Sequence, residues 1–267
     1  SAVSRMVRDL EEQLEVKLFR PAGRGVELTD AGRNLAEKLH ADLERLRQTL
    51  RHAGAAGDME RTLTIGVLPT FGARWLAPRL RNFRDENPSI QLAILSRAEP
   101  FDLQKEGIDI AIHFGQKEWV DGTLTDLCPE DLVVIAPPEL SSEAPSIEEI
   151  ATLPLLHLRT RPNLWHQFFT THGLETEGAR RGAIFDQFST MIASVRHGLG
   201  AAIVPSYLIE RELQDSSLRL LGRLPPSGGM YYVVTPKGIN DPGAQAFKAW
   251  VLREVRSSSQ FREPLSF

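Results

Sequence analysis

The feature that most constrains the fold is a rhythm of short β-type runs and amphipathic helical segments that begins at Thr62. Apolar runs predict strands at 63–68, 90–95, 108–112 and 132–135, and helical patterns lie between them at 72–86 and 101–106. Strands that alternate with helices predict an α/β fold with a mostly parallel sheet and helices on both faces.

The same rhythm restarts after Pro137-Pro138. Further strands are predicted at 155–158, 182–185, 200–205 and 231–234, and a capping box at Ser146–Glu149 predicts the start of a short helix. Forward and return crossings near 136 and 235 predict two lobes, one of 58–135 plus 236–267 and one of 136–235. Ligands of such folds bind at the carboxyl ends of strands, near helix N-termini.

Residues 1–29 predict a small separate domain. Val3, Val7, Leu10 and Leu14 form one helical stripe, and the opposite face carries Ser4, Arg5, Arg8, Glu11 and Glu12. The alternation around the turn at 21–25 predicts a hairpin, with Arg20 and Arg24 at its tip. These arginines suit either DNA phosphates or an ordinary solvated surface.

A leucine stripe follows in the segment 30–57. Thr29 is a candidate helix cap, and leucines recur at 35, 39, 43, 46 and 50 before the flexible joint at 53–57. Such a stripe usually packs on its own domain, but no domain lies close in sequence here. A helix of this length therefore needs another apolar partner in water.

Composition narrows the function classes. The net charge of −4 does not predict a uniformly basic DNA-binding protein, so any DNA contact must rest on a local surface. No apolar run approaches the ~20 residues that span a bilayer. The chain shows no export signal, and its one cysteine, Cys128, agrees with a reducing cytoplasm.

Enzyme signatures are not found. His157, His166 and His172 lack metal-ligand spacing, and Cys128 has no identifiable base. The glycines of 197–200 follow a helix instead of a strand, which favours a tight turn over a dinucleotide site. We therefore expect no enzyme activity, no metal and no cofactor.

Residues 1–32 resemble the recognition helix and wing of LysR-type transcriptional regulators. The resemblance rests on Ser-Ala-Val-Ser-Arg, Leu-Phe-Arg and Arg-Gly-Val-Glu-Leu-Thr-Asp-Ala-Gly. It continues through the blocks at 69–80, 107–115, 129–133 and 197–205. The runs 160–165 and 185–186 are similar to the branch typified by glycine-cleavage activators and β-lactamase regulators.

The resemblance implies a partial winged helix-turn-helix domain at 1–29, since roughly thirty further residues precede this point in the family. It implies a linker helix at 30–57 that pairs in a dimer, with tetramers built by the sensor domains. Operator DNA and RNA polymerase are the implied macromolecular partners. The implied DNA-facing residues are Ser1, Ala2, Ser4, Arg5, Arg8, Arg20 and Arg24.

The resemblance also implies a small-molecule effector in the interlobe cleft of a periplasmic-binding-protein-like domain. The candidate contacts are Thr70, Phe71, Ser96, His113, Phe114, His157, Gln187, Phe188 and Ser189. Many members of the branch carry Arg where His113 stands, so a carboxylate effector is less strongly predicted. Thr70 is equally a helix cap, and His113 is more often a core histidine.

These observations predict a DNA-binding transcriptional regulator that a small effector controls. The alternative is a periplasmic-type solute-binding receptor with the same two-lobed fold. Such a receptor would need an export signal and would have no use for residues 1–50, so the N-terminal segment favours the regulator.

Overall fold

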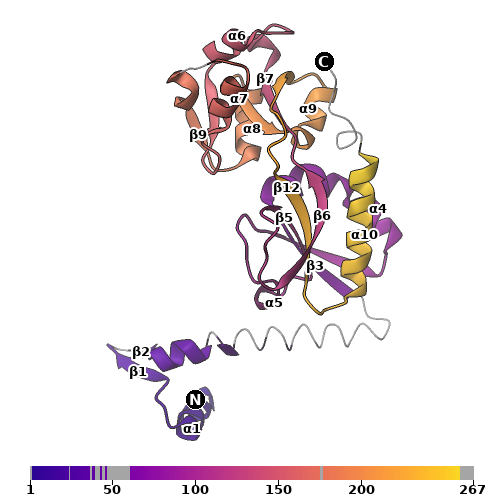
Figure 1. Ribbon diagram of the computed structural model, residues 1–267. Coiled ribbons are helices and arrows are strands. Elements are labelled where there is room, and N and C mark those ends of the chain that lie inside the picture. Colours follow the sequence, from indigo (N-terminus) through magenta and orange to yellow (C-terminus); the bar gives the residue numbers. More distant parts are fainter. Residues whose placement is uncertain are drawn as a thin grey trace. The chain divides into compact units, whose positions relative to one another are not determined.

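The computed structural model describes residues 2–23, 25–36, 38–39, 43, 46, 61–174 and 177–258. The chain forms two compact units, an N-terminal one of residues 1–61 with 104–107 and a C-terminal one of residues 62–103 with 108–267. Figure 1 traces the elements of both units. The predictions for Ser1 and Arg24, for Leu50 and for the joint at 53–57 lie outside the described residues.

The N-terminal unit contains the predicted helix and hairpin. Helix α1 spans Ala2–Leu14, and strands β1 (Phe19–Ala22) and β2 (Gly25–Leu28) pair antiparallel. Thr29 caps the next helix, because its Oγ1 accepts a hydrogen bond of 3.0 Å from the Gly32 N–H. Residues 30–36 and 38–39 are helical, which confirms the predicted start.

Three leucines of the stripe are exposed, and Leu35 at its start is half-buried. Leu39, Leu43 and Leu46 keep 45%, 52% and 53% of their surface open. Isolated exposed leucines are common, but these three recur at the four- and three-residue spacing that puts them on one face of a helix.

The C-terminal unit contains two lobes. The first lobe consists of a five-stranded sheet and the helices that pack on it. The strand order is β4 (Ile90–Ser96), β3 (Arg61–Val67), β5 (Ile110–Gly115), β12 (Met230–Pro236) and β6 (Gly122–Pro129). Its helical segments are α3 (Pro69–Phe71), η1 (Gly72–Leu76), η2 (Ala77–Arg79), α4 (Leu80–Glu86) and α10 (Pro242–Ser257). The short helix α5 (Leu103–Glu106) begins in this unit, and its residues from Gln104 on are counted with the N-terminal unit. In Figure 1 α4 and α10 lie side by side, and the ring of Phe83 packs 5.3 Å from that of Trp250.

A second five-stranded sheet and its helices form the second lobe. The strand order is β11 (Arg219–Arg223), β7 (Leu132–Ala136), β10 (Ala201–Pro205), β8 (Leu155–Leu158) and β9 (Ala183–Phe185). The longer helices are α6 (Ile147–Thr152), α7 (Leu164–Thr171), α8 (Phe188–Arg196) and α9 (Glu210–Gln214). Short 3-10 segments are η3 (Pro138–Leu140), η4 (Glu177–Arg180) and η5 (Ser206–Leu208).

Both sheets are mixed, so the prediction of a mostly parallel sheet was wrong. β3 and β5 run parallel, as do β10, β8 and β9, but the strands next to the two crossings pair antiparallel. The chain leaves the first lobe along β6 and returns along β12, which places two oppositely directed neighbours at that edge.

The lobe boundaries also differ from the prediction. β7 belongs to the second sheet and β12 to the first, so the crossings lie before residue 132 and before residue 230. Strands β6 and β11 and helix α9 were not predicted. A register shift interrupts the pairing of β6 at Tyr231 and Tyr232, and mixed burial along β6 hides the alternation typical of a strand.

One apolar core continues from one lobe into the other. Val67, Phe71 and Trp75 of the first lobe share it with Met191 and Tyr207 of the second, each 2% exposed or less. The lobes therefore pack directly on each other, and the space left between them is limited.

The turn at 197–200 has the predicted helix-to-strand geometry. Gly200 has a φ of 153°, and a Cβ there would lie 2.1 Å from the carbonyl oxygen of Pro154. Only glycine allows this approach. Within the described ranges, no helix is both long and apolar enough to cross a bilayer, and no group of three or more His, Cys, Asp or Glu side chains is placed to hold a metal ion.

Candidate functional site

A pocket of about 540 Å³ lies between the two lobes. The first lobe supplies 68–71, which follow β3, and Phe114 and Gly115 at the end of β5. The second lobe supplies 158–161 at the end of β8 and 186–188 at the start of α8. The pocket therefore forms at the carboxyl ends of parallel strands, where a ligand site was expected.

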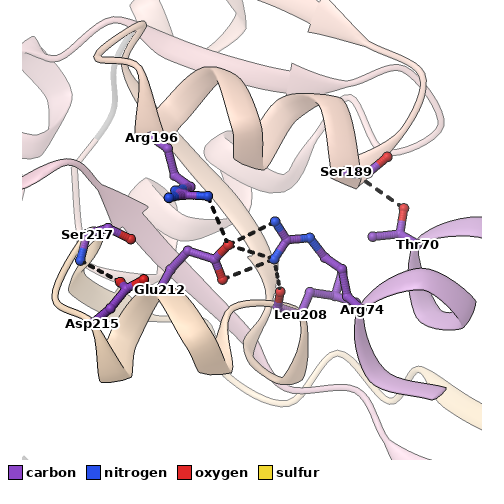
Figure 2. Close-up of polar contacts among 8 residues, drawn as sticks. All are labelled: Thr70, Arg74, Ser189, Arg196, Leu208, Glu212, Asp215 and Ser217. Carbon is purple, nitrogen blue, oxygen red and sulfur yellow. Dashed lines mark hydrogen bonds and ion pairs between the residues drawn. The ribbon is translucent and has the colours of Figure 1, made fainter. Parts of the chain in front are cut away.

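Five of the predicted effector residues line this pocket, namely Thr70, Phe71, Phe114, Gln187 and Phe188. Thr70 is buried and does not cap its helix, because Leu68 occupies the N-cap position. Its Oγ1 instead accepts a hydrogen bond of 3.3 Å from the Ser189 N–H across the lobes (Figure 2). Ser189 thus adjoins the pocket through its backbone.

Three other predicted residues lie away from the lining. His113 alternates with Phe114 along β5, so its ring faces the opposite side of the sheet and packs 4.9 Å from that of Trp119. Burial there lowers the pKa of His113. His157 Nε2 lies 3.1 Å from the Arg181 carbonyl oxygen, and Ser96 is exposed at the end of β4. The structure therefore does not bring these three to the pocket.

Aromatic rings form the floor of the pocket. The ring centroids of Phe71 and Tyr231 are 5.7 Å apart, and those of Phe71 and Tyr207 are 5.5 Å apart. Phe114 adds a fourth ring, 4.8 Å from Tyr231. Burial raises the pKa of both tyrosines, so their hydroxyl groups stay protonated. An apolar floor of this kind suits a ligand with an apolar body.

A buried ion pair lies at the wall of the pocket. Arg161 Nη1 donates a hydrogen bond of 2.6 Å to Glu130, whose side chain is 2% exposed. Glu130 lies on the first crossing between the lobes, and its N–H donates to the Gly229 carbonyl near the second crossing. Burial raises the pKa of Glu130, and the nearby guanidinium of Arg161 opposes that shift.

A second buried ion pair joins the lobes. Arg74, in the π-helical segment η1, makes a two-pronged contact with Glu212 of α9 at 2.9–3.0 Å, and also donates to the Leu208 carbonyl (Figure 2). The Glu212 side chain is 4% exposed, and Arg196 lies 4.0 Å away. The paired geometry satisfies both carboxylate oxygens in a dry environment.

We expect Arg74→Met to lower the free energy of unfolding of the whole chain by about 3 kcal/mol, because it leaves the buried Glu212 carboxylate without its main partner. Urea denaturation measures this loss. The double variant Arg74→Met/Glu212→Leu should recover most of it. Lys117→Met is the matched control, since Lys117 and Asp126 pair at 2.6 Å but are more than half exposed, and it should cost under about 1 kcal/mol. Equal losses from the two single variants would contradict a buried clamp.

The surface of α1 differs from the prediction. Ser4, Arg8 and Glu11 do not face away from the apolar stripe, but line a groove with Val3 and Val7. Strand β1 and Val26 complete this groove of about 720 Å³, and Arg20 stands at its edge. Val3 is 68% exposed. Arg5 is exposed and lies outside the lining of the groove.

Glu11 fixes the hairpin to α1. Its carboxylate accepts hydrogen bonds from the N–H groups of Leu18 (2.8 Å) and Phe19 (3.1 Å) and from Lys17 Nζ (2.9 Å). These donors lower the pKa of Glu11 to about 2. A carboxylate that accepts several hydrogen bonds holds its charge to low pH.

Glu11→Gln should loosen the hairpin at neutral pH. A depressed pKa contributes stability that is present above about pH 4.5 and is lost as the pH falls through about 2. The difference between wild type and variant in hydrogen exchange at the Leu18 N–H should therefore be largest at neutral pH and shrink below pH 4.5. Glu12→Gln, at the exposed neighbouring position, should change nothing. A difference that does not depend on pH would refute the charged role of Glu11.

The pocket also contains residues that the sequence did not single out. They include Arg159, Arg161, Asp186, Tyr207 and Tyr231. The run 160–165, which contains Arg161, had been noted only as a family block, although arginines within three residues of the end of a predicted strand are a usable signal for a ligand site. The tyrosines gave no such signal, because their position depends on how the two lobes pack.

Residues 56–256 match the LysR substrate binding domain family, and residues 1–33 match the bacterial regulatory helix-turn-helix proteins of the lysR family. The chain belongs to the LysR-type transcriptional regulators, as the sequence predicted.

Similar proteins are themselves regulators. The chain is 31% identical to the carbapenem-hydrolyzing β-lactamase transcriptional activator of Enterobacter cloacae over 96% of this chain and 87% of that protein. It is 32% identical to the regulator TrpI of Pseudomonas aeruginosa over 95% and 88%. The effector domain of AmpR from P. aeruginosa is 28% identical and superposes with a TM-score of 0.65 over 75% of this chain and 98% of that one.

A likeness in fold extends to both units. CrgA of Neisseria meningitidis, a LysR-type regulator, superposes with a TM-score of 0.63 at 20% identity over 95% of this chain and 89% of that one. The expected combination of a helix-turn-helix segment and a two-lobed effector domain is confirmed.

Proposed function

We propose that this regulator senses a small molecule in the pocket between its lobes. The observation that carries the proposal is the position of the pocket, which is enclosed by both lobes at the carboxyl ends of β3, β5 and β8. A ligand there touches both lobes at once, so its binding free energy depends on how they pack. Such differential binding is what a switch requires.

Thr70, Phe71, Phe114, Gln187 and Phe188 are the proposed effector contacts. Thr70 is central to the proposal because its hydroxyl already bridges the lobes to Ser189. A ligand that hydrogen-bonds Thr70 would compete with this bridge or add to it. Either outcome shifts the balance between arrangements of the lobes.

The proposed DNA contacts are Ser4, Arg5, Arg8 and Arg20, together with Ser1, Ala2 and Arg24 from the sequence prediction. The amino half of a recognition helix reaches base edges, and flanking arginines grip phosphates. Arg20 also pairs with Glu27 at 2.6 Å on the exposed hairpin. That pair holds the arginine along the paired strands of the hairpin, two residue pairs from the turn, where a phosphate could meet it.

Assembly through the leucine stripe is part of the proposal. Leu39, Leu43 and Leu46 are about half exposed, and a second copy of the same helix would cover them. Dimers that pair again through the C-terminal units would give tetramers. We place this regulator in the cytoplasm, where its operator DNA and RNA polymerase are found.

The alternative, a periplasmic-type solute-binding receptor, shares the two-lobed fold but does not fit the family to which the chain belongs. The helix-turn-helix match at 1–33 favours the regulator. Catalysis by the single thiol, Cys128, has little support, because burial raises its pKa to about 12 and so suppresses the reactive thiolate.

A thermal-shift screen of the whole chain tests the effector pocket. The panel comprises amino acids, small carboxylates, quaternary amines and cell-wall fragments. A binding compound should raise the melting temperature saturably. Thr70→Val and Phe188→Ala should each weaken this response about tenfold or more, since one removes a buried hydrogen-bonding group and the other a wall of the pocket.

Ser96→Ala is the matched control for the screen, because Ser96 lies near the same strand ends but is exposed and outside the lining. It should leave the response unchanged. A compound whose thermal shift survives both pocket variants would place the effector site elsewhere.

Arg5→Ala and Arg8→Ala should each weaken operator binding by the full-length protein. If each arginine contacts a phosphate, the slope of log affinity against log salt should fall by about 1 per variant. Fluorescence anisotropy with labelled operator DNA at several salt concentrations gives this slope. Arg81→Ala, 81% exposed on α4, serves as the control. Wild-type slopes in both N-terminal variants would remove these residues from the DNA-facing surface.

A further inference from the structure

We infer that Arg161 anchors a carboxylate group of the effector, and that the effector is a carboxylate on an apolar body. The inference rests on the proposed effector pocket and adds the chemical class of its ligand. It comes from the position of one guanidinium, its fixed orientation and the charges around it.

Arg161 is oriented before any ligand arrives. Its guanidinium carbon lies 4.4 Å from the ring centroid of Phe114 and 5.4 Å from that of Phe188, so two aromatic rings hold the plane of the group. Glu130 holds one corner through Nη1 at 2.6 Å. A guanidinium fixed in this way loses little rotamer freedom on binding, which favours a planar partner.

The remaining donors of Arg161 are accessible from the cavity. A guanidinium carries five N–H donors, and within the described part of the chain Glu130 is the side-chain acceptor found for it, through Nη1. The Arg161 side chain is 20% exposed and lines the effector pocket. It also lines an adjoining cavity of about 460 Å³, which shares Phe114 and Gly115 with the first. Arg161 therefore lines both cavities.

The charges around the pocket disfavour a multiply charged anion, so the recognition of a carboxylate rests on the geometry of Arg161 and not on excess positive charge. Glu130 neutralises the positive charge of Arg161 through their ion pair. Along the lining, Arg159 then faces two carboxylates, Glu99 and Asp186. A doubly charged phosphate would meet two carboxylates and little net positive charge, whereas one carboxylate fits the two-pronged geometry of a guanidinium.

The rest of the lining specifies the body of the ligand. Four aromatic rings form the floor and wall of the pocket, namely those of Phe71, Phe114, Phe188 and Tyr231. A carboxylate held by Arg161 would place the attached group against these rings. Arg159, two residues away, is exposed, so it contributes charge but little fixed geometry.

The test uses sodium benzoate and sodium phenylacetate as probes, with benzamide and phenylacetamide as uncharged counterparts. Each is titrated into the full chain while the arginine side-chain Nε–H resonances are followed by NMR. We expect both carboxylates to shift the Arg161 resonance saturably and the two amides to leave it unchanged. Arg161→Lys keeps a positive charge beside Glu130 but removes the fork, and it should weaken carboxylate binding about tenfold to a hundredfold.

Two further variants separate ligand binding from stability. Arg161→Met/Glu130→Gln leaves no buried charge unpaired, so it should fold and still lose carboxylate binding to a similar degree. Arg159→Met is the matched control for local charge and should change affinity by less than about twofold, because exposed charges are screened.

Three results would overturn the inference. One is equal binding of benzamide and benzoate, and another is wild-type benzoate affinity in Arg161→Lys. The third is the lack of any Arg161 shift with either carboxylate up to its solubility limit. If an uncharged or cationic compound from the thermal screen still binds and loses affinity in Phe188→Ala, the proposed pocket stands and the carboxylate anchor fails. If no compound depends on Phe188 or Thr70, the proposed function fails as well.

Discussion

The packing of Phe71 against Tyr207 and Tyr231 is the contact on which the C-terminal unit depends. Phe71 follows the first strand of the first lobe, Tyr207 belongs to the second lobe, and Tyr231 lies on the returning strand; each is 2% exposed or less. Separating the lobes would expose all three rings to water, at a cost of several kcal/mol. The pocket therefore has a fixed floor, and any movement that an effector causes must be a small adjustment and not a wide opening.

Much of the fold followed from local patterns. The helix and hairpin at the N-terminus, the Thr29 cap, the capping box at Ser146 and the strands β3, β8 and β10 each carry a signal within a few residues. The antiparallel strands at the crossings do not. Their pairing is decided by contacts far away in sequence, and the bulge beside Tyr231 breaks the alternation of β6.

The lining of the pocket was predicted only in part, because some of its residues carry a local sequence signal and others depend on contacts far away in sequence. Thr70, Phe71, Phe114, Gln187 and Phe188 do line the pocket, because strand ends and helix starts can be read from sequence; their contact with an effector stays a prediction. His113 and Phe114 were both chosen, although neighbouring strand residues face opposite sides, so one had to be turned away. Arg161 was passed over because its role depends on Glu130, which is thirty-one positions away in the chain.

Cys128 has a practical consequence of a different kind. It is the one thiol of the chain, 3% exposed, and paired in register with Tyr231 where β6 and β12 meet. Alkylating reagents attack the thiolate, which burial suppresses in the closed sheet. The labelling rate then follows the fraction of time for which this pair of strands is apart. The alkylation rate of Cys128 thus reports local opening of the sheet near the junction of the lobes, and no engineered cysteine is needed to measure it.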